Sequence, residues 1–315
     1  MMSQADPTPA VRSVRIYTHP ACLAHDTGPD HAERPERLRA VVDALRQLPG
    51  LDWQEAPVAT REQLARVHAP ALLRQVLDET CTQRRQLDPD TLLSPGSREA
   101  ALRAAGAAVA AVDAVMSGPA TRVFCAVRPP GHHATADMAM GFCLFNSIAV
   151  AAAHALEHHG LARVAIVDFD VHHGNGSQDI FAAEPRLLFA SSHQSPLYPG
   201  SGAIEECGIG NIHNAPLPPG AGSTEFRAAW CDQLLPAVHV FAPQLLLVSA
   251  GFDAHRSDPL AQLELEADDY AWLTRELCAI ADRHAGGRLV SLLEGGYDLD
   301  ALRECSQAHV RALAA

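Results

Sequence analysis

The stretch Ala162–Gly176, with the sequence ARVAIVDFDVHHGNG, decides the fold prediction for this chain. It starts with an apolar, mostly β-branched run and ends in aspartates, histidines and glycines. A strand that is apolar at every position, rather than at alternate positions, is typical of a parallel sheet covered by helices on both faces. Binding sites in such sheets form at the carboxyl ends of the strands. The stretch therefore predicts an α/β fold with a polar site directly after a buried strand.

The same alternation of short apolar runs and longer helical segments continues along the whole chain. Strands are predicted over Val14–Tyr17, Arg122–Val127, Ala162–Phe169, Leu187–Ala190, Gln244–Ala250 and Arg288–Leu293. Helices, in which apolar residues recur every three or four positions, are predicted over Pro35–Gln47, Ser97–Met116, Phe145–His159, Ser223–Val240, Ala267–His284 and Asp298–Leu313. The stretch Ser191–Gly222, rich in Gly, Pro and Ser, predicts a long functional loop. We therefore expect one α/β domain over residues 1–315, with a mainly parallel central sheet flanked by helices and a disordered tail over residues 1–12.

Composition narrows the class of protein. The chain has 315 residues, of which 48% are hydrophobic and 19% charged, which suits a large core. Lys and Arg total 24 against 37 Asp and Glu, and the net charge of −13 disfavours nucleic-acid and membrane partners. The eight cysteines form no C-x-x-C pair, and the first residues lack the pattern of a signal peptide. We expect a cytoplasmic protein with reduced cysteines.

Chemically versatile side chains follow four of the predicted strands. The segments are Arg128–His133 (RPPGHH), Asp168–Gly176 (DFDVHHGNG), Gly251–Pro259 (GFDAHRSDP) and Glu294–Tyr297 (EGGY). Each segment taken singly is compatible with an ordinary turn, a pair of surface histidines or a packed aromatic. Taken together they provide metal ligands, an acid–base pair and a hydrogen-bond donor, which are the parts of a metallohydrolase.

The acidic residues among them predict a cation site. Asp168, Asp170 and His172 follow one another at every second position, so in an extended chain they point to the same side. Buried carboxylates that converge in this way need a cation, and a mixture with imidazole suits Zn²⁺, and also Fe²⁺ or Mn²⁺. Asp253 and Asp258 are two further acids that could complete a set of three ligands and leave one position open.

These motifs, in this order, resemble the zinc-dependent histone deacetylases, including the bacterial histone-deacetylase-like amidohydrolases and the acetylpolyamine amidohydrolases. The segment His25–Arg37 (HDTGPDHAERPER) is similar to the amino-terminal motif of that family. The resemblance implies a single arginase-like α/β domain. It also implies an amidohydrolase that removes acetyl or other short acyl groups from acetyl-lysine or related acylated amines.

The resemblance further implies roles for individual residues. One Zn²⁺ per chain, or Fe²⁺ as the alternative ion, would be held by Asp170, His172 and Asp258. His132 and His133 would be the catalytic pair, with Asp168 orienting His132, and Tyr297 would face the acyl carbonyl. The walls of a narrow substrate channel would be Gly141, Phe142 and Tyr198. A structural K⁺ ion would lie beside Asp168, Asp170, His172, Ser191 and Ser192.

Two positions resemble class II members of the family rather than class I. Asn175 stands where many class I members have an aspartate behind the second histidine, and Glu294 stands in place of a glycine. An amide orients a histidine without adding negative charge. We therefore expect His133 to be less basic than His132, which has Asp168 as its partner.

Three other functions are alternatives for a site with these residues, and the residues argue against two of them. The chain could be an acetylpolyamine deacetylase, since its negative charge suits cationic substrates of both kinds. A binuclear manganese ureohydrolase would need a second set of acidic and histidine ligands, and His132–His133 offers no such acid. A non-catalytic module that binds acylated amines predicts the loss of a ligand or of Tyr297, and both are present.

Overall fold

A computed structural model describes residues 13–118 and 121–315 of the chain. Its centre is an eight-stranded sheet in the order β2-β1-β5-β10-β9-β6-β7-β8. Every neighbouring pair in this sheet is parallel. The predicted parallel α/β domain is therefore confirmed. The tail expected over residues 1–12 lies outside the described residues.

The strands of the sheet follow the predicted runs closely and add two at its edges. They are β1 (Val14–Thr18), β2 (Asp52–Glu55), β5 (Arg122–Cys125), β6 (Val164–Asp168), β7 (Leu187–Gln194), β8 (Ile212–Leu217), β9 (Leu245–Ala250) and β10 (Leu289–Leu293). A separate antiparallel hairpin is formed by β3 (Arg85–Asp88) and β4 (Thr91–Leu93). Every residue of β5, β6, β9 and β10 is buried, as expected for strands covered on both faces.

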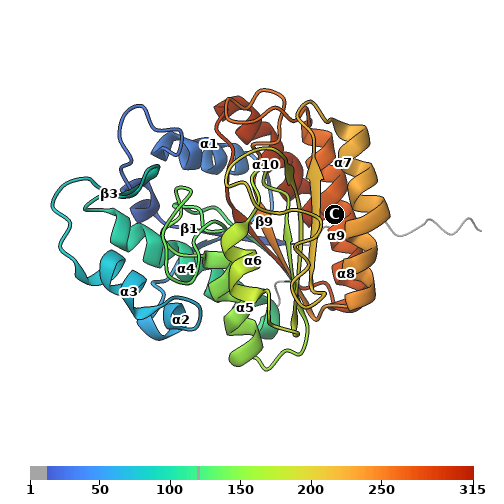
Figure 1. The fold of residues 1–315 in the computed structure, drawn as a ribbon, viewed down its shortest axis with the longest axis horizontal. Helices are drawn as coiled ribbons and strands as arrows, with labels where there is room; N and C mark the ends of the chain where they lie inside the picture. The colour runs from blue at the N-terminus through green and yellow to red at the C-terminus, as the bar shows by residue number, and fades with distance from the viewer. Residues whose placement is uncertain (1–12, 119–120) are drawn as a thin grey trace, which may run out of the picture.

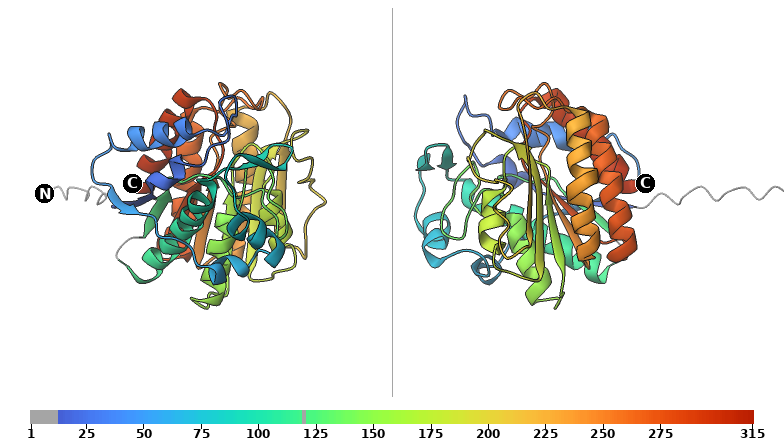
Figure 2. Two further views of the ribbon diagram at one scale, coloured as in Figure 1. Left: turned by 90° about the vertical axis from the view of Figure 1, so that its left-hand side faces the viewer. Right: turned by 45° about the vertical axis from the view of Figure 1, so that its right-hand side comes forward.

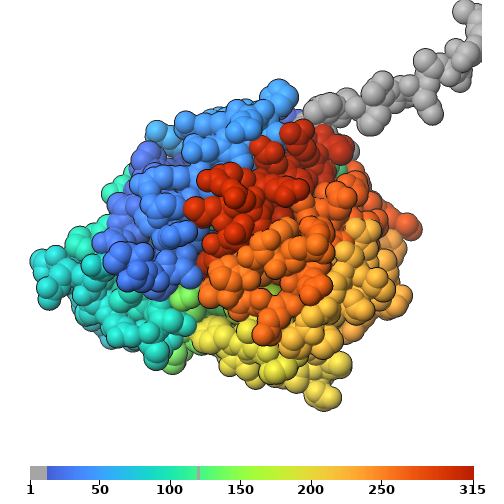
Figure 3. All heavy atoms as spheres, turned by 90° about the horizontal axis from the view of Figure 1, so that it is seen from above, coloured from blue at the N-terminus to red at the C-terminus, as the bar shows by residue number. Residues whose placement is uncertain are grey.

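Helices cover both faces of the sheet (Figures 1 and 2). One layer contains α4 (Ser97–Ser117), α5 (Ser147–Glu157) and α6 (Asn175–Phe181). The other contains α1 (Pro35–Leu45), α7 (Ser223–Ala229), α8 (Leu235–Phe241), α9 (Ala267–His284) and α10 (Leu299–Ala314). The shorter α2 (Arg61–Ala65) and α3 (Pro70–Leu73) pack beside the first layer. From above, α1 and α10 lie side by side on the surface (Figure 3).

The central helix α4 is rich in alanine because it lies inside the fold. By length and composition alone its 21 residues could cross a membrane, but 67% of its most apolar window is buried within the protein. It packs against α5 and against β5 and β10. Small side chains allow this close approach of helix to sheet, so the composition of α4 is explained by core packing.

Several elements were not predicted, among them β2, β8 and α6, and Ser191–Gly222 is not one continuous loop. Strand β7 continues to Gln194, and β8 occupies Ile212–Leu217. Because β8 is an edge strand, it accommodates Pro216, which has no backbone N–H to donate. The opposite edge strand β2 is half exposed and polar, so its sequence lacks the apolar run that marks the central strands. Helix α6 begins with Asn175 and Gly176, which are poor helix formers.

Candidate active site

Four neighbouring strands carry the four motifs. In the sheet, β5, β10, β9 and β6 lie next to one another, although they come from distant parts of the chain. Their register aligns the strand ends, since Leu293 pairs with Ala250 and Asp168 pairs with Ser249. The residues that follow these strands therefore meet at one edge of the sheet, as parallel topology requires.

Asp170, His172 and Asp253 form a compact buried cluster there. Nδ1 of His172 lies 3.1 Å from Oδ1 of Asp170 and 3.1 Å from Oδ2 of Asp253. One ligand atom from each residue lies within 4.8 Å of the other two. Donor atoms of a tetrahedral zinc site, with bonds of roughly 2.0–2.1 Å, are separated by about 3.3 Å. The cluster therefore has the donor types, and in its two distances to His172 the spacing, that suit a divalent metal ion.

The electrostatics of the cluster also favour a cation. Burial, together with the charge of Asp170, raises the pKa of Asp253. Burial likewise raises the pKa of the neighbouring Asp168 to about 6. For His172, burial lowers the pKa, but the two carboxylates outweigh this effect and raise it to about 10. The carboxylates that raise the pKa of His172 create a negative potential in the cluster, and this potential also attracts other positive charges. A divalent cation would neutralise the same carboxylates.

Asp258 is the third acid named for the metal, and its role as a ligand stays a prediction. The donor atoms of Asp170 and His172 lie within 4.8 Å of a carboxylate oxygen of Asp253. Both carboxylate oxygens of Asp258 accept backbone hydrogen bonds, from Leu260 N at 3.0 Å and from Tyr297 N at 2.7 Å. Burial and the charge of Asp253 raise the pKa of Asp258 to about 7, and the charge of His172 also acts on it, so Asp258 lies beside the same cluster.

The two histidines that follow β5 are oriented so that each leaves one nitrogen free. His132 donates Nδ1–H to Oδ2 of Asp168 at 3.0 Å, and His133 donates Nδ1–H to Oδ1 of Asn175 at 2.8 Å. The ring centroids are 4.0 Å apart, and Nε2 of His132 lies 3.8 Å from Asp170. Nε2 of each ring is therefore available for proton transfer beside the cluster.

The two rings differ in basicity in the predicted direction. Burial lowers the pKa of His132, but Asp170 and Asp168 outweigh it and raise this pKa well above its ordinary value. Burial and the neighbouring charges of His132 and His172 lower the pKa of His133 well below its ordinary value. The pair thus combines a protonated imidazole with a neutral one, which suits acid–base chemistry.

Glu294 holds the turn that presents these histidines. Its Oε2 accepts the backbone N–H of Gly131 at 2.7 Å and of His132 at 3.2 Å, and Oε1 accepts from Ser249 Oγ at 3.3 Å. A glycine at position 294, as in class I members, could not make these bonds. The next residue, Gly295, approaches the cluster so closely that a Cβ would lie 2.1 Å from Oδ2 of Asp253.

Tyr297 lies at the other side of the site. Its side chain is buried, and burial raises its pKa well above the ordinary value, so the phenol stays protonated. The guanidinium of Arg37 lies 4.8 Å from the ring centroid. A hollow of ≈ 290 Å³ opens at Tyr297 between Pro259 and the segment Pro29–Arg34.

The three predicted channel residues lie around these groups. The ring of Phe142 packs against Tyr297 at 5.9 Å and against His31 at 4.7 Å. The ring of Tyr198 packs edge-on against His133 at 5.1 Å and is 37% exposed. Gly141 passes directly beneath the His133 ring. Aromatic rings thus flank the site on its tyrosine side and on its histidine side.

Substituting Gly141 by alanine should reduce turnover strongly. Gly141 has φ of +56°, and an added Cβ would lie 2.4 Å from Cδ2 of His133. Relief of this clash must displace His133, and misplacement of a catalytic group by about 1 Å costs roughly 100-fold in rate. Steady-state kinetics on an acetyl-lysine peptide, with a thermal melt to verify folding, would measure the effect. A folded variant with wild-type kcat would show that the position of His133 is unimportant.

A buried ion cluster, which was not predicted from the sequence, bonds the backbone of the segment that carries Tyr297. Glu33 binds the guanidinium of Arg37 at 2.9 Å, and both Nε and Nη2 of Arg128. Arg37 in turn donates to the carbonyls of Gly296 at 2.5 Å and Glu294 at 2.6 Å. Glu33 and Arg37 belong to the amino-terminal motif, but only the fold brings them beneath the Glu294–Tyr297 segment.

The substitution Glu33→Gln should destabilise the protein by roughly 3–5 kcal/mol, because two buried guanidinium groups would lose their counter-charge. Burial opposes ionisation of Glu33, but Arg128 and Arg37 outweigh it and lower the pKa from 4.5 to about 2. A pKa that is lower in the folded protein stabilises the fold above pH 4.5, and this stabilisation is lost as the pH falls towards 2. Urea unfolding should therefore show a large difference from wild type at pH 7 and a shrinking one below pH 4.5. Equal stability at pH 7 would contradict the assignment.

The predicted K⁺ site remains a prediction. In the register, Ser191 of β7 pairs with Asp168 of β6, so the two segments named for that site are adjacent. The Ser191 hydroxyl bonds His193 Nδ1 at 3.0 Å, and the Ser192 hydroxyl accepts from Trp230 Nε1 at 3.0 Å.

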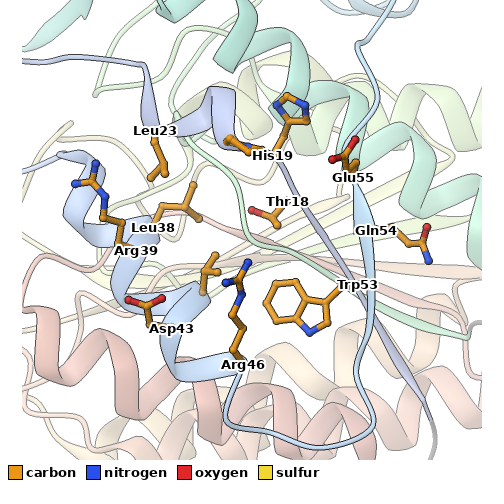
Figure 4. A pocket seen from close by; sticks show the side chains of 12 residues that line it. Thr18, His19, Leu23, Leu38, Arg39, Asp43, Arg46, Trp53, Gln54 and Glu55 are labelled. Atoms are coloured by element: carbon orange, nitrogen blue, oxygen red, sulfur yellow. The ribbon is translucent and has the colours of Figure 1, made fainter.

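A cavity of ≈ 500 Å³ lies away from these residues (Figure 4). It is bounded by α1 and the ends of β1 and β2, with Trp53 and Arg46 facing each other across 5.8 Å. Its lining contains none of the predicted site residues.

The fold and the site together place the chain among the metal-dependent hydrolases. The family model of the histone deacetylase domain matches residues 31–313. The chain belongs to the histone deacetylase family, whose members are deacetylases and amidohydrolases.

Relatives and a solved structure agree with this assignment. The histone deacetylase-like amidohydrolase of Pseudomonas aeruginosa is 39% identical, over 96% of this chain and 86% of that protein. Human polyamine deacetylase HDAC10 is 39% identical over 86% of this chain and 43% of its own length. The crystal structure of the HDA15 HD domain superimposes with a TM-score of 0.91 at 34% identity, covering 97% of this chain and 89% of that one. The single arginase/deacetylase-like domain inferred from the sequence is thereby confirmed.

Proposed function

We propose that the protein removes acetyl or other short acyl groups from acetyl-lysine or related linear acylated amines, with one Zn²⁺ held by Asp170, His172 and Asp258. The observation that carries this proposal is the buried cluster of two carboxylates and one imidazole beside two oriented histidines. Family membership supports it over the manganese ureohydrolase and the non-catalytic binding module.

When bound, the metal would act as a Lewis acid that polarises the amide carbonyl and makes water more acidic. The chain supplies the proton transfers. His133 is neutral, and the hydrogen bond to Asn175 keeps its proton on Nδ1, so Nε2 can accept a proton from the attacking water. The same nitrogen can then return that proton to the leaving amine.

Two further groups stabilise the charge that develops. His132 is held protonated by Asp168 and Asp170, and it places a positive charge beside the reacting centre. The Tyr297 phenol can donate a hydrogen bond to the carbonyl oxygen as this oxygen becomes anionic. Arg37 packs over the tyrosine ring and thereby helps to orient it.

The surroundings of the site support a linear, cationic substrate. Phe142 and Tyr198 provide apolar walls for an alkyl chain. The charges of Asp88 and Asp90, on the β3–β4 hairpin, act on the Tyr198 hydroxyl. These two acids therefore lie near Tyr198, one wall of the proposed substrate channel. The net charge of −13 adds a field that favours cations over the whole surface. A cytoplasmic location stays a prediction from the sequence.

Acetylpolyamines are the second candidate substrates, and the 39% identity to a polyamine deacetylase favours them. To separate the two, the zinc-loaded protein should be assayed with an acetyl-lysine peptide and with acetylputrescine side by side. We expect turnover of the peptide, with the Asp258→Asn variant as the blank. A higher kcat/KM on acetylputrescine would instead support the polyamine function, and no turnover of either amide would contradict the proposal.

A further inference from the structure

A second group of metal-ligating side chains lies at the far end of the α4–α5 layer. It consists of Asp113 on α4 and of His154, His158 and His159 at the end of α5. The N-cap of α5, Asn146, bonds the carbonyl of Ala134 beside the catalytic histidines, so α5 starts at the active site. Its 11 residues extend roughly 16 Å from there. The histidine cluster is therefore spatially separate from the catalytic one.

The four side chains converge closely. Oδ1 of Asp113 lies 2.7 Å from Nε2 of His154 and 2.8 Å from Nε2 of His159. The rings of His154 and His158 stack at 4.7 Å with 14° between their planes. One donor atom from each of the four residues lies within 4.8 Å of all the others.

We propose that this cluster, outside the active site, binds a second divalent transition-metal ion of the Zn²⁺, Co²⁺ and Ni²⁺ class. Three imidazoles and one carboxylate are the ligands that these ions prefer, and Ca²⁺ or Mg²⁺ would require more oxygen. Within the described residues, the ring nitrogens of His158 have no hydrogen-bond partner, and its side chain is exposed. The Asp113 carboxylate is half exposed. These groups can adjust around an ion without movement of the backbone.

Arg66 determines how the fourth ligand joins. Its Nη1 lies 2.8 Å from Nδ1 of His154, and a guanidinium can only donate. Nδ1 of His154 therefore carries no proton, and Nε2–H donates to Asp113. For Nε2 to bind a metal, the proton must move to Nδ1 and Arg66 must turn away. Asp113, His158 and His159 are thus the primary ligands, and Arg66 opposes the contribution of His154 both by its hydrogen bond and by its charge.

The test uses the zinc-loaded full-length protein and Ni²⁺ as the probe. Equilibrium dialysis followed by elemental analysis should show one additional Ni²⁺ per wild-type chain. The His158→Ala/His159→Ala double variant should lose that equivalent and keep both its zinc and its deacetylase activity. The Arg66→Met variant should bind the additional Ni²⁺ roughly fivefold more tightly, because a positive charge near the ligands is removed.

The matched control is another histidine pair, in which Nδ1 of His239 and Nε2 of His284 lie 3.1 Å apart. Among the described residues, no carboxylate is bonded to either ring. The His239→Ala/His284→Ala variant should retain the additional Ni²⁺. Its loss in this variant would assign the ion to that pair and overturn the proposal. Retention in the His158→Ala/His159→Ala variant, or no additional equivalent in the wild type, would also overturn it. The catalytic proposal is unaffected, because it is tested by the zinc-dependent activity.

Discussion

The Asp258→Asn variant should lose the catalytic metal and with it almost all deacetylase activity. Asp258 is buried, and it lies close enough to Asp253 and His172 for their charges to act on its carboxyl group. An amide oxygen is a far weaker ligand than a carboxylate, and removal of one of three protein ligands leaves two, which is too few for a zinc site of the usual kind. Elemental analysis after dialysis should show less than stoichiometric zinc, and kcat/KM should fall by roughly 1000-fold or more.

The matched control is Asp253→Asn. Asp253 is also buried and also lies after β9, and its oxygens bond Val171 N and Nδ1 of His172. This variant should keep its zinc and lose rate through displacement of His172, by roughly 10–100-fold. If Asp253→Asn loses zinc while Asp258→Asn keeps it, Asp253 is the third ligand and the proposed ligand set is wrong.

The Tyr297→Phe variant should lower kcat by roughly 100–1000-fold and leave zinc content unchanged. Its hydroxyl can donate to a developing oxyanion, and a preorganised donor of this kind contributes a few kcal/mol to lowering the barrier. Phenylalanine keeps the ring beneath Arg37, so packing is preserved. Steady-state kinetics with an acetyl-lysine peptide measure the loss.

The division between kcat and KM tests the assigned role. A donor that acts on the transition state should affect kcat much more than KM. Near-wild-type turnover by a correctly folded Tyr297→Phe protein would eliminate the oxyanion role. A rise in KM alone would show that Tyr297 binds the substrate and does not contribute to the chemical step.

The architecture followed from local sequence because the central strands are buried on both faces. A continuous apolar run such as Val164–Val167 has no other stable location in a water-soluble fold, so β6 and its neighbours were predicted within a few residues. The edge strands β2 and β8 were missed because one side of an edge strand faces solvent or a turn, and its composition then resembles a loop.

The histidine pair, Asp170, His172 and Tyr297 could be selected from the sequence because each follows a strand end directly or within a few residues. Asp258 as the third ligand was implied by the motif and stays a prediction. The path of the loop after β9, which the motif does not give, decides that the Asp253 carboxylate contacts His172 and that Asp258 reaches the backbone of Tyr297.

The order of residue types along the chain determined the α/β class, the family and the groups available for catalysis, because these depend on local burial and on side-chain chemistry. Tertiary structure alone decided that Asp253 contacts His172 and that Glu33 and Arg37 support the tyrosine segment. It also brought Asp113 to the histidines at the end of α5. Such contacts join residues far apart in sequence, and their geometry is set by how strands and helices pack, which the spacing within one motif does not encode.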